Sequence, residues 1–189
     1  MKLIDRVLQR WRIAKAASFI PRGARVLDLA CADGALFRQL DAQVGDGLGI
    51  DPVLKHNTQV GRFPLIAGWF PQDMPAAAPR FDVITMLAVL EHIPETEWDK
   101  VARACADWLK PDGQLIITVP SPLVDRILNV LLFCKLIEGM SLEQHHGFDV
   151  SQTPGIFARG GLQPVQKRKF QLGLNNLFVF KKPKSSNAI

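Results

Sequence analysis

The stretch that decides the fold is Arg25-Val26-Leu27-Asp28-Leu29-Ala30-Cys31-Ala32-Asp33-Gly34-Ala35-Leu36. Its apolar run at 26–29 is typical of a buried parallel strand, whereas residues 35–40 have helical spacing. Small residues at 30, 32 and 34 join the two and allow a ligand to approach the backbone closely. A strand, a tight turn and a helix in this order predict the opening unit of an α/β sheet that binds ligands at its carboxyl edge.

Two acidic residues stand where predicted strands end. Asp28 belongs to the first strand and is expected to face the crevice at the carboxyl edge of the sheet. A second apolar run, Leu48-Gly49-Ile50, ends in Asp51 and Pro52. A separation of roughly twenty residues suits a carboxylate that accepts hydrogen bonds from ribose hydroxyls. The pattern therefore predicts a nucleoside-containing ligand.

Four segments in order resemble the class I S-adenosylmethionine-dependent methyltransferases. Residues 26–34 look like the first motif of that family, and Gly49-Ile50-Asp51-Pro52 is similar to its ribose-binding motif. Residues 81–94 and 109–115 match the later motifs in spacing. The resemblance covers residues 22–120 closely and implies S-adenosyl-L-methionine as the cofactor. It departs from the family at Ala30 and Ala32, where glycine is usual.

The resemblance also implies which residues hold the cofactor. Asp51 would bind the ribose, and the turn from Ala30 to Gly34 would bind the methionine part. The family commonly has an acid after the third strand, beside the adenine amino group, where this chain has Trp69 and Phe70. These rings either stack on the adenine or belong to the core. The expected cofactor-binding residues are Asp28, Ala30, Cys31, Ala32, Gly34, Asp51, Pro52, Gly68, Trp69, Phe70 and Leu87.

Methyl transfer to a neutral acceptor benefits from a base near the acceptor's proton, and histidines are the candidates. His92 follows the fourth predicted strand, and His145 and His146 follow a later apolar segment. The alternatives are a capping or surface role for His92 and a polar loop for the other two. Ubiquinone-pathway O-methyltransferases share the Leu-Glu-His sequence and complete a metal site with an acid three residues before the glutamate. This chain has Ala88 there, so no metal is expected.

Further helices are expected at 3–20, 95–108 and 151–160, and further strands at 63–68, 81–87 and 115–119. The first helix either packs on the domain or closes over the cofactor. Two last strands at 162–170 and 177–181 are joined by a connection that permits only an antiparallel pair. Dinucleotide dehydrogenases normally stay parallel here, whereas the methyltransferase family ends in such a hairpin. The predicted fold is α/β: a doubly wound, mostly parallel seven-stranded sheet with a C-terminal antiparallel hairpin.

We expect one methyltransferase domain over residues 1–189, with an N-terminal helix within 1–21 and an inserted segment at 121–150. The broad apolar face within 123–137 indicates a lid or substrate-facing helix, with core packing or a dimer seam as the alternatives. The chain is expected to be a monomer or a homodimer.

The composition favours a cytoplasmic protein. The three cysteines of the chain form no CxxC pair, and the N-terminal segment lacks the apolar run of a secretory signal. The most apolar stretch carries too many charges to span a bilayer. The net charge of +5 is scattered, with clusters at 167–169 and 181–184. We interpret them as a solvated edge and a charged tail, and expect no nucleic-acid partner.

Two functions from different classes remain open at this point. The first is methyl transfer to a small-molecule acceptor, possibly to an oxygen of a hydrophobic substrate. The second is a catalytically weak or inactive module of the same fold, prompted by Ala30, Ala32 and the missing adenine acid. A nucleic-acid methyltransferase is disfavoured, because the basic residues form no stripe.

Overall fold

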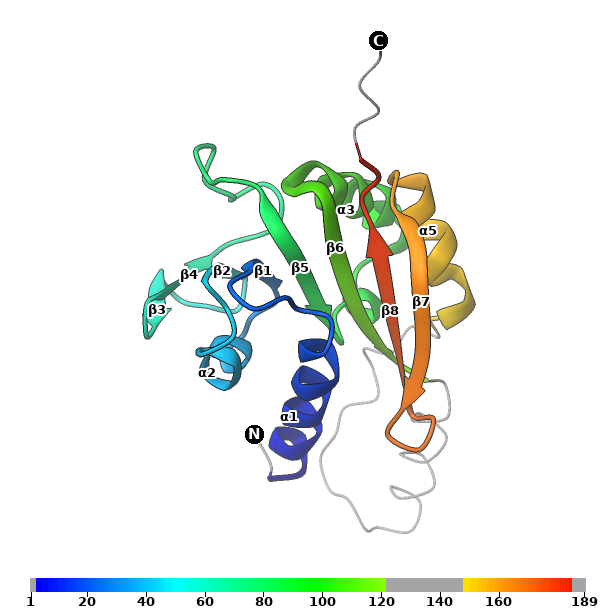
Figure 1. Cartoon of the computed structure of the whole chain (residues 1–189), viewed down its shortest axis with the longest axis horizontal. Helices are drawn as coiled ribbons and strands as arrows, with labels where there is room; N and C mark the ends of the chain where they lie inside the picture. The colour runs from blue at the N-terminus through cyan, green and yellow to red at the C-terminus, as the bar shows by residue number, and fades with distance from the viewer. Residues whose placement is uncertain (1–2, 122–147, 185–189) are drawn as a thin grey trace.

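The computed structural model describes residues 3–121 and 148–184, and one mixed sheet organises them (Figure 1). The sheet has eight strands in the order β3-β4-β2-β1-β5-β6-β8-β7. The central five, β4, β2, β1, β5 and β6, are parallel, whereas β3, β8 and β7 pair antiparallel with their neighbours. The strands are β1 Arg25–Leu29, β2 Asp46–Asp51, β3 Thr58–Val60, β4 Phe63–Ala67, β5 Phe81–Leu87, β6 Leu109–Pro120, β7 Gln163–Phe170 and β8 Asn175–Lys181. The mostly parallel, doubly wound sheet with a C-terminal hairpin is thus confirmed.

The expected number of strands, seven, is one too few. The additional strand is β3, which lies at the edge of the sheet and pairs Val60 with Phe63 of β4. Its first two residues are exposed, and Val60 is half-buried against the core on the α1–α2 side. A polar edge strand of this length carries no apolar alternation, so the sequence gives no signal for it.

Helices cover both faces of the sheet (Figure 1). Helices α1 (Leu3–Ala17) and α2 (Ala35–Leu40) pack on one face, and α3 (Glu95–Trp108) and α5 (Thr153–Arg159) pack on the other. Two short 3₁₀ helices, η1 (Leu90–His92) and η3 (Val150–Gln152), precede α3 and α5. The inward face of α3 carries Trp98, Val101, Ala102 and Cys105 at helical spacing, which explains why this segment forms a helix against the sheet.

The core is divided by the sheet into two clusters of buried side chains. On the α1–α2 side, Phe37 stacks on Phe63 with ring centroids 4.6 Å apart. On the α3–α5 side, Phe157 packs against Phe180 with centroids 5.1 Å apart. The sheet is therefore fixed from both faces, and its carboxyl edge is left to the connecting turns.

The C-terminal hairpin closes one side of the sheet. Strand β8 pairs antiparallel with β6, and β7 forms the outer edge. Lys167, Arg168 and Lys169 lie on β7 and are largely exposed, as the interpretation of a solvated edge requires. Positive charges along an edge strand also disfavour pairing with another chain.

Some boundaries differ from the expectations. Helix α1 ends at Ala17, before the expected residue 20. Strand β6 begins at Leu109 instead of 115, because Leu109 already pairs with Phe81 across a bulge. The expected insertion at 121–150 lies almost entirely outside the described residues, so it and the extent of the domain stay predictions. Within the described residues, none of the helices is both long and apolar enough to cross a bilayer.

Candidate active site

The turn that follows β1 is held in an unusual backbone conformation. Ala30, Ala32 and Gly34 have φ angles of 54°, 46° and 73°, which lie in the left-handed region. An L-residue in this region costs about 1–2 kcal/mol, a cost that glycine avoids. The amides of Ala30 and Gly34 donate to the carbonyls of Ile50 (2.9 Å) and Cys31 (2.8 Å), and these bonds fix the turn across the end of β2.

Asp51 anchors this turn from the neighbouring strand. Its carboxylate is only 4% exposed, with Oδ2 accepting from the Ala32 amide (2.7 Å) and Oδ1 accepting from the Val53 amide (2.8 Å). Each carboxylate oxygen can accept a further hydrogen bond. Asp51 therefore stands at the carboxyl edge beside the turn, where the sequence placed it, with acceptor capacity left for a ligand hydroxyl. The adjacent Pro52 is exposed.

Asp28 is the buried acid of the site. It is 5% exposed, and its Oδ1 accepts a hydrogen bond of 2.7 Å from the Thr85 hydroxyl of β5. Burial raises the pKa of Asp28 to about 7, the charge of Asp51 adds to this rise, and the Thr85 hydrogen bond opposes it. Near neutral pH this carboxyl can therefore gain or lose its charge in response to a bound cation.

A cavity of about 210 Å³ joins these elements at the carboxyl end of β1. Five of the expected cofactor-binding residues line it: Asp28, Ala30, Cys31, Ala32 and Leu87. Since β1 lies between β2 and β5, this is the switch point at which open α/β sheets bind ligands. The volume is below the roughly 300–1,000 Å³ of small-molecule sites, so the cavity fits one part of a larger ligand.

The remaining expected residues lie outside this cavity. Gly34 caps α2, and the Gly68 amide donates to the Asp51 carbonyl (3.2 Å), which keeps Gly68 at the same edge of the sheet. Phe70 is half-buried and packs against the core on the α3 side, as its core alternative proposed. Trp69 is 66% exposed and is no core residue.

Asp73 follows the two aromatic residues and was not among the expected cofactor-binding residues. Its Oδ2 accepts a hydrogen bond of 2.7 Å from the Trp69 amide, which returns the side chain to the end of β4. The side chain lies so close to Gly68 that a Cβ there would be 2.6 Å from the Asp73 Cβ. The end of β4 therefore does carry an acid, and it comes from a position later in the chain than the family's usual one. The signal in the sequence is the acid itself, four residues after Trp69 and within reach of one turn.

Helix α1 also contributes to the site. Gln9, Arg12 and Ile13 line the cavity of 210 Å³, opposite the turn after β1. The same helix buries Ile13 and Ala16 against the sheet, so it packs on the domain and borders the cavity at once. The two roles proposed for this helix are therefore not exclusive.

His92 lies in a different cavity from the turn after β1. It is exposed at the end of η1 and lines a space of about 570 Å³ with Glu91, Ile93, Pro94, Glu95, Trp98 and Phe148. Among the described residues, none lines both cavities. His145 and His146 lie outside the described residues. In the part of the chain that is described, no three His, Cys, Asp or Glu side chains group as metal ligands would.

Cys31 is excluded as a nucleophile by its surroundings. Burial raises the pKa of its thiol, and the charges of Asp28 and Asp51 raise it further. Only the thiolate is strongly nucleophilic, so this side chain acts by packing. Its sulfur lies against Gly49 of β2.

These features define a nucleoside-binding protein of the methyltransferase type. They are an open α/β sheet, a tight turn after β1 that lines the cavity, an acid at the end of β2 and a terminal antiparallel hairpin. The model of the family described as "Methyltransferase domain" matches residues 3–157. The chain belongs to this family of S-adenosylmethionine-dependent methyltransferases, which confirms the resemblance and assigns S-adenosyl-L-methionine as the cofactor.

Curated relatives are ubiquinone biosynthesis O-methyltransferases. The protein from Stutzerimonas stutzeri is 33% identical over 105 residues, which cover 51% of this chain and 44% of the relative. The protein from Bordetella avium is 24% identical over 160 residues, which cover 78% of this chain and 65% of the relative. The chain thus spans about half to two thirds of the length of these relatives.

Solved structures share the fold at low identity. Magnesium protoporphyrin IX methyltransferase from Synechocystis, with bound S-adenosylhomocysteine, has a TM-score of 0.67 at 15% identity and covers 96% of this chain and 88% of its own. The 1,6-didemethyltoxoflavin-N1-methyltransferase from Burkholderia thailandensis has a TM-score of 0.68 at 16% identity, with coverages of 95% and 82%. At these identities the similarity establishes the fold.

Proposed function

We propose that this protein transfers a methyl group from S-adenosylmethionine to an oxygen atom of a hydrophobic small molecule. The observation that carries the proposal is the pair of buried acids, Asp28 and Asp51, on either side of the turn after β1. The relatives named as O-methyltransferases support oxygen as the acceptor atom.

Each part of the cofactor has a candidate partner in this arrangement. Asp51 would accept hydrogen bonds from the ribose hydroxyls through its remaining lone pairs. Asp28 would face the methionine ammonium group, whose positive charge favours the ionised carboxylate. Arg12, on the α1 side of the same cavity, would pair with the methionine carboxylate.

The adenine would lie at the end of β4, next to Gly68 and Trp69. Asp73 comes to this edge and has one carboxylate oxygen, Oδ1, outside its bond to the Trp69 amide. That oxygen could accept a hydrogen bond from the adenine amino group, and the exposed Trp69 ring could stack on the base.

The cofactor, when bound, supplies a methyl group on a sulfonium sulfur, so the protein mainly has to align the acceptor and exclude water. We assign the base to His92, which would take the proton of the acceptor hydroxyl as the methyl–oxygen bond forms and the methyl–sulfur bond breaks. The cavity that it lines has apolar walls from Ile93, Trp98 and Phe148, which suit a hydrophobic acceptor. His145 and His146 remain alternative bases.

The alternative is a module that binds the cofactor or a partner and transfers no methyl group. The left-handed alanines favour it, because their methyl groups narrow a turn that glycine would leave open. Binding and turnover together separate the two functions.

The test is a titration of S-adenosylmethionine by isothermal calorimetry, followed by measurement of S-adenosylhomocysteine release with an alkyl-substituted catechol as the probe acceptor. We expect binding, and in His92→Gln a fall in kcat of about 100-fold with an unchanged dissociation constant for S-adenosylhomocysteine. His56→Gln, an exposed histidine away from that cavity, serves as the control. Absence of binding at millimolar cofactor would contradict the proposal and favour the partner-binding module.

A further inference from the structure

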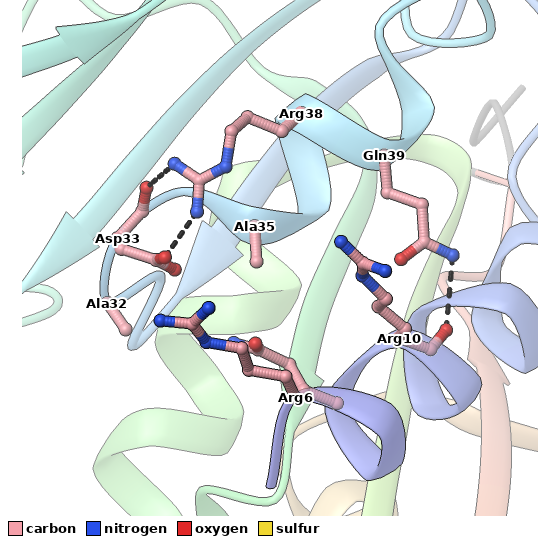
Figure 2. Close-up of a pocket in the computed structure, with 8 residues that line it drawn as sticks. Arg6, Arg10, Ala32, Asp33, Ala35, Arg38 and Gln39 are labelled. Atoms are coloured by element: carbon pink, nitrogen blue, oxygen red, sulfur yellow. Dashed lines mark hydrogen bonds and ion pairs between the residues drawn. The ribbon is translucent and has the colours of Figure 1, made fainter. Parts of the chain in front are cut away.

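A third and larger cavity lies between α1 and α2, beside the turn after β1 (Figure 2). Its volume is about 880 Å³. Arg6 and Arg10 extend from α1 toward α2 and the turn, and Arg38 extends from α2 along the opposite wall (Figure 2). We call this space the arginine cavity. Nothing in the cofactor-binding arrangement described above uses these three side chains.

The lining of the arginine cavity has an excess of positive charge. Among the described residues that line it, three arginines face one acid, Asp33. Arg38 pairs with the Asp33 carboxylate and also donates to its backbone carbonyl. Among the described residues, Arg6 and Arg10 have no carboxylate within 4.0 Å of their guanidinium groups. Because arginine stays protonated in proteins, two uncompensated charges point into the same space.

The two walls are fixed relative to each other. The Gln39 side-chain amide donates a hydrogen bond of 3.1 Å to the Arg10 carbonyl and so ties α2 to α1 (Figure 2). Below this link, Ile13 of α1 and Phe37 of α2 are buried in one cluster. The backbone positions of the arginines are thus set before any ligand arrives, which reduces the entropy cost of binding.

The arginine cavity adjoins the cofactor cavity. Gln9, Ala32 and Ala35 line both of them. A ligand with one end near the methionine part of the cofactor could therefore place its other end among the arginines. The carboxylate of the cofactor already has a candidate partner in Arg12, which lines the smaller cavity and not the arginine cavity.

We propose that the arginine cavity binds a phosphate group, and that this group belongs to the methyl acceptor. A guanidinium offers two parallel N–H donors that match the oxygens of a phosphate. A phosphate monoester carries about −1.5 to −2 charges near pH 7, which matches the excess of two positive charges. The binding of phosphate stands on the cavity alone, whereas its assignment to the acceptor rests on the proposed function.

The experiment titrates inorganic pyrophosphate into the protein by isothermal calorimetry at low salt. We expect binding by the native chain and at least a tenfold loss of affinity in the double variant Arg6→Gln/Arg10→Gln. Both side chains are exposed, so the substitutions leave the core intact. Arg103→Gln, on the exposed side of α3 at the other face of the sheet, is the matched control and should bind pyrophosphate as the native chain does. Absence of pyrophosphate binding, or equal binding by the double variant, would overturn the phosphate site.

Two further measurements identify the source of the phosphate. The double variant should retain its affinity for S-adenosylhomocysteine within threefold. If neither the native chain nor the double variant binds S-adenosylhomocysteine, but the native chain still binds pyrophosphate, the proposed function fails and the phosphate site stands. Vesicles with one part phosphatidylglycerol to three parts phosphatidylcholine should not co-sediment with the native chain. Co-sedimentation that the double variant loses would assign the arginines to a lipid surface and overturn their assignment to the acceptor.

Discussion

Asp28 is buried and lines the cofactor cavity, so its charge depends on pH near neutrality. The Thr85 hydroxyl is its hydrogen-bond donor, and burial raises the pKa of Asp28 to about 7. In the unfolded chain the same carboxyl titrates near 3.8. Between these values the folded state keeps a proton that the unfolded state has released.

This difference predicts the pH dependence of stability. Because the folded state binds more protons, the contribution of Asp28 to stability is full below about pH 4 and is lost as the pH rises through about 7, by on the order of 4 kcal/mol. In Asp28→Asn this loss should be absent. Urea unfolding of both proteins from pH 4 to 8 measures it, and parallel curves for the two would show that Asp28 does not titrate in this range.

Ala30 and Ala32 stand at two positions where the family usually has glycine. Both hold left-handed φ angles in the folded turn. A sequence shows which residues stand at these positions, and the resemblance made the departure visible. It does not show that the alanines keep the left-handed conformation, because the Asp51 bond to the Ala32 amide imposes it from another strand.

The strain predicts the effect of restoring glycine. Ala32→Gly should stabilise the protein by about 0.5–1 kcal/mol, since removing the left-handed strain outweighs the larger entropy of the unfolded chain. The control is Ala106→Gly in α3, where the same change should destabilise by about 1 kcal/mol. Thermal and urea unfolding compare the two. Destabilisation by Ala32→Gly would show that its methyl group contributes packing rather than strain.

Strand β2 supports the turn through a glycine. A Cβ at Gly49 would lie 2.6 Å from the Cys31 sulfur and 2.6 Å from Cδ2 of Leu65. The turn after β1 can therefore sit on β2 only where the strand has no side chain. This contact explains why a glycine stands inside an otherwise apolar strand.

We predict that Gly49→Ala destabilises the protein by about 1–3 kcal/mol and weakens S-adenosylhomocysteine binding, because Cys31 must shift with its turn. Gly155→Ala in α5 is the control, since a Cβ there meets nothing closer than 3.7 Å and the residue is helical. That change should be neutral or slightly stabilising. Unfolding curves and calorimetry measure both effects. An unchanged affinity in Gly49→Ala would contradict the expected shift of Cys31 and its turn.

Helix α1 marks the limit of what the sequence could predict for an element. Its amphipathic spacing predicted a helix packed on the domain, and the buried Ile13 and Ala16 confirm that packing. Which polar residues border the cofactor cavity depends on how the helix crosses the sheet, and this is a tertiary property. Gln9 and Arg12 were therefore not found from the sequence.

For the molecule as a whole, the doubly wound, mostly parallel sheet could be predicted because four motifs stand in the order and spacing of the methyltransferase family. The final hairpin followed because its short connection excludes a parallel return. Local side-chain geometry was beyond reach: the Asp73 carboxylate returns to the end of β4 through a turn that brings it to the Trp69 amide, four residues earlier. His92 and the turn after β1 follow neighbouring parallel strands, yet they line separate cavities.

The account depends on a nucleoside lying across the carboxyl edge of the sheet, with its sugar at Asp51. The most direct measurement is a crystal structure of the protein with S-adenosylhomocysteine. We predict the ribose hydroxyls within hydrogen-bond distance of the Asp51 carboxylate and the methionine ammonium group beside Asp28, in the cavity between α1 and the turn. Density for the ligand at any other place, with Asp51 bonded only to the amides of Ala32 and Val53, would contradict the account.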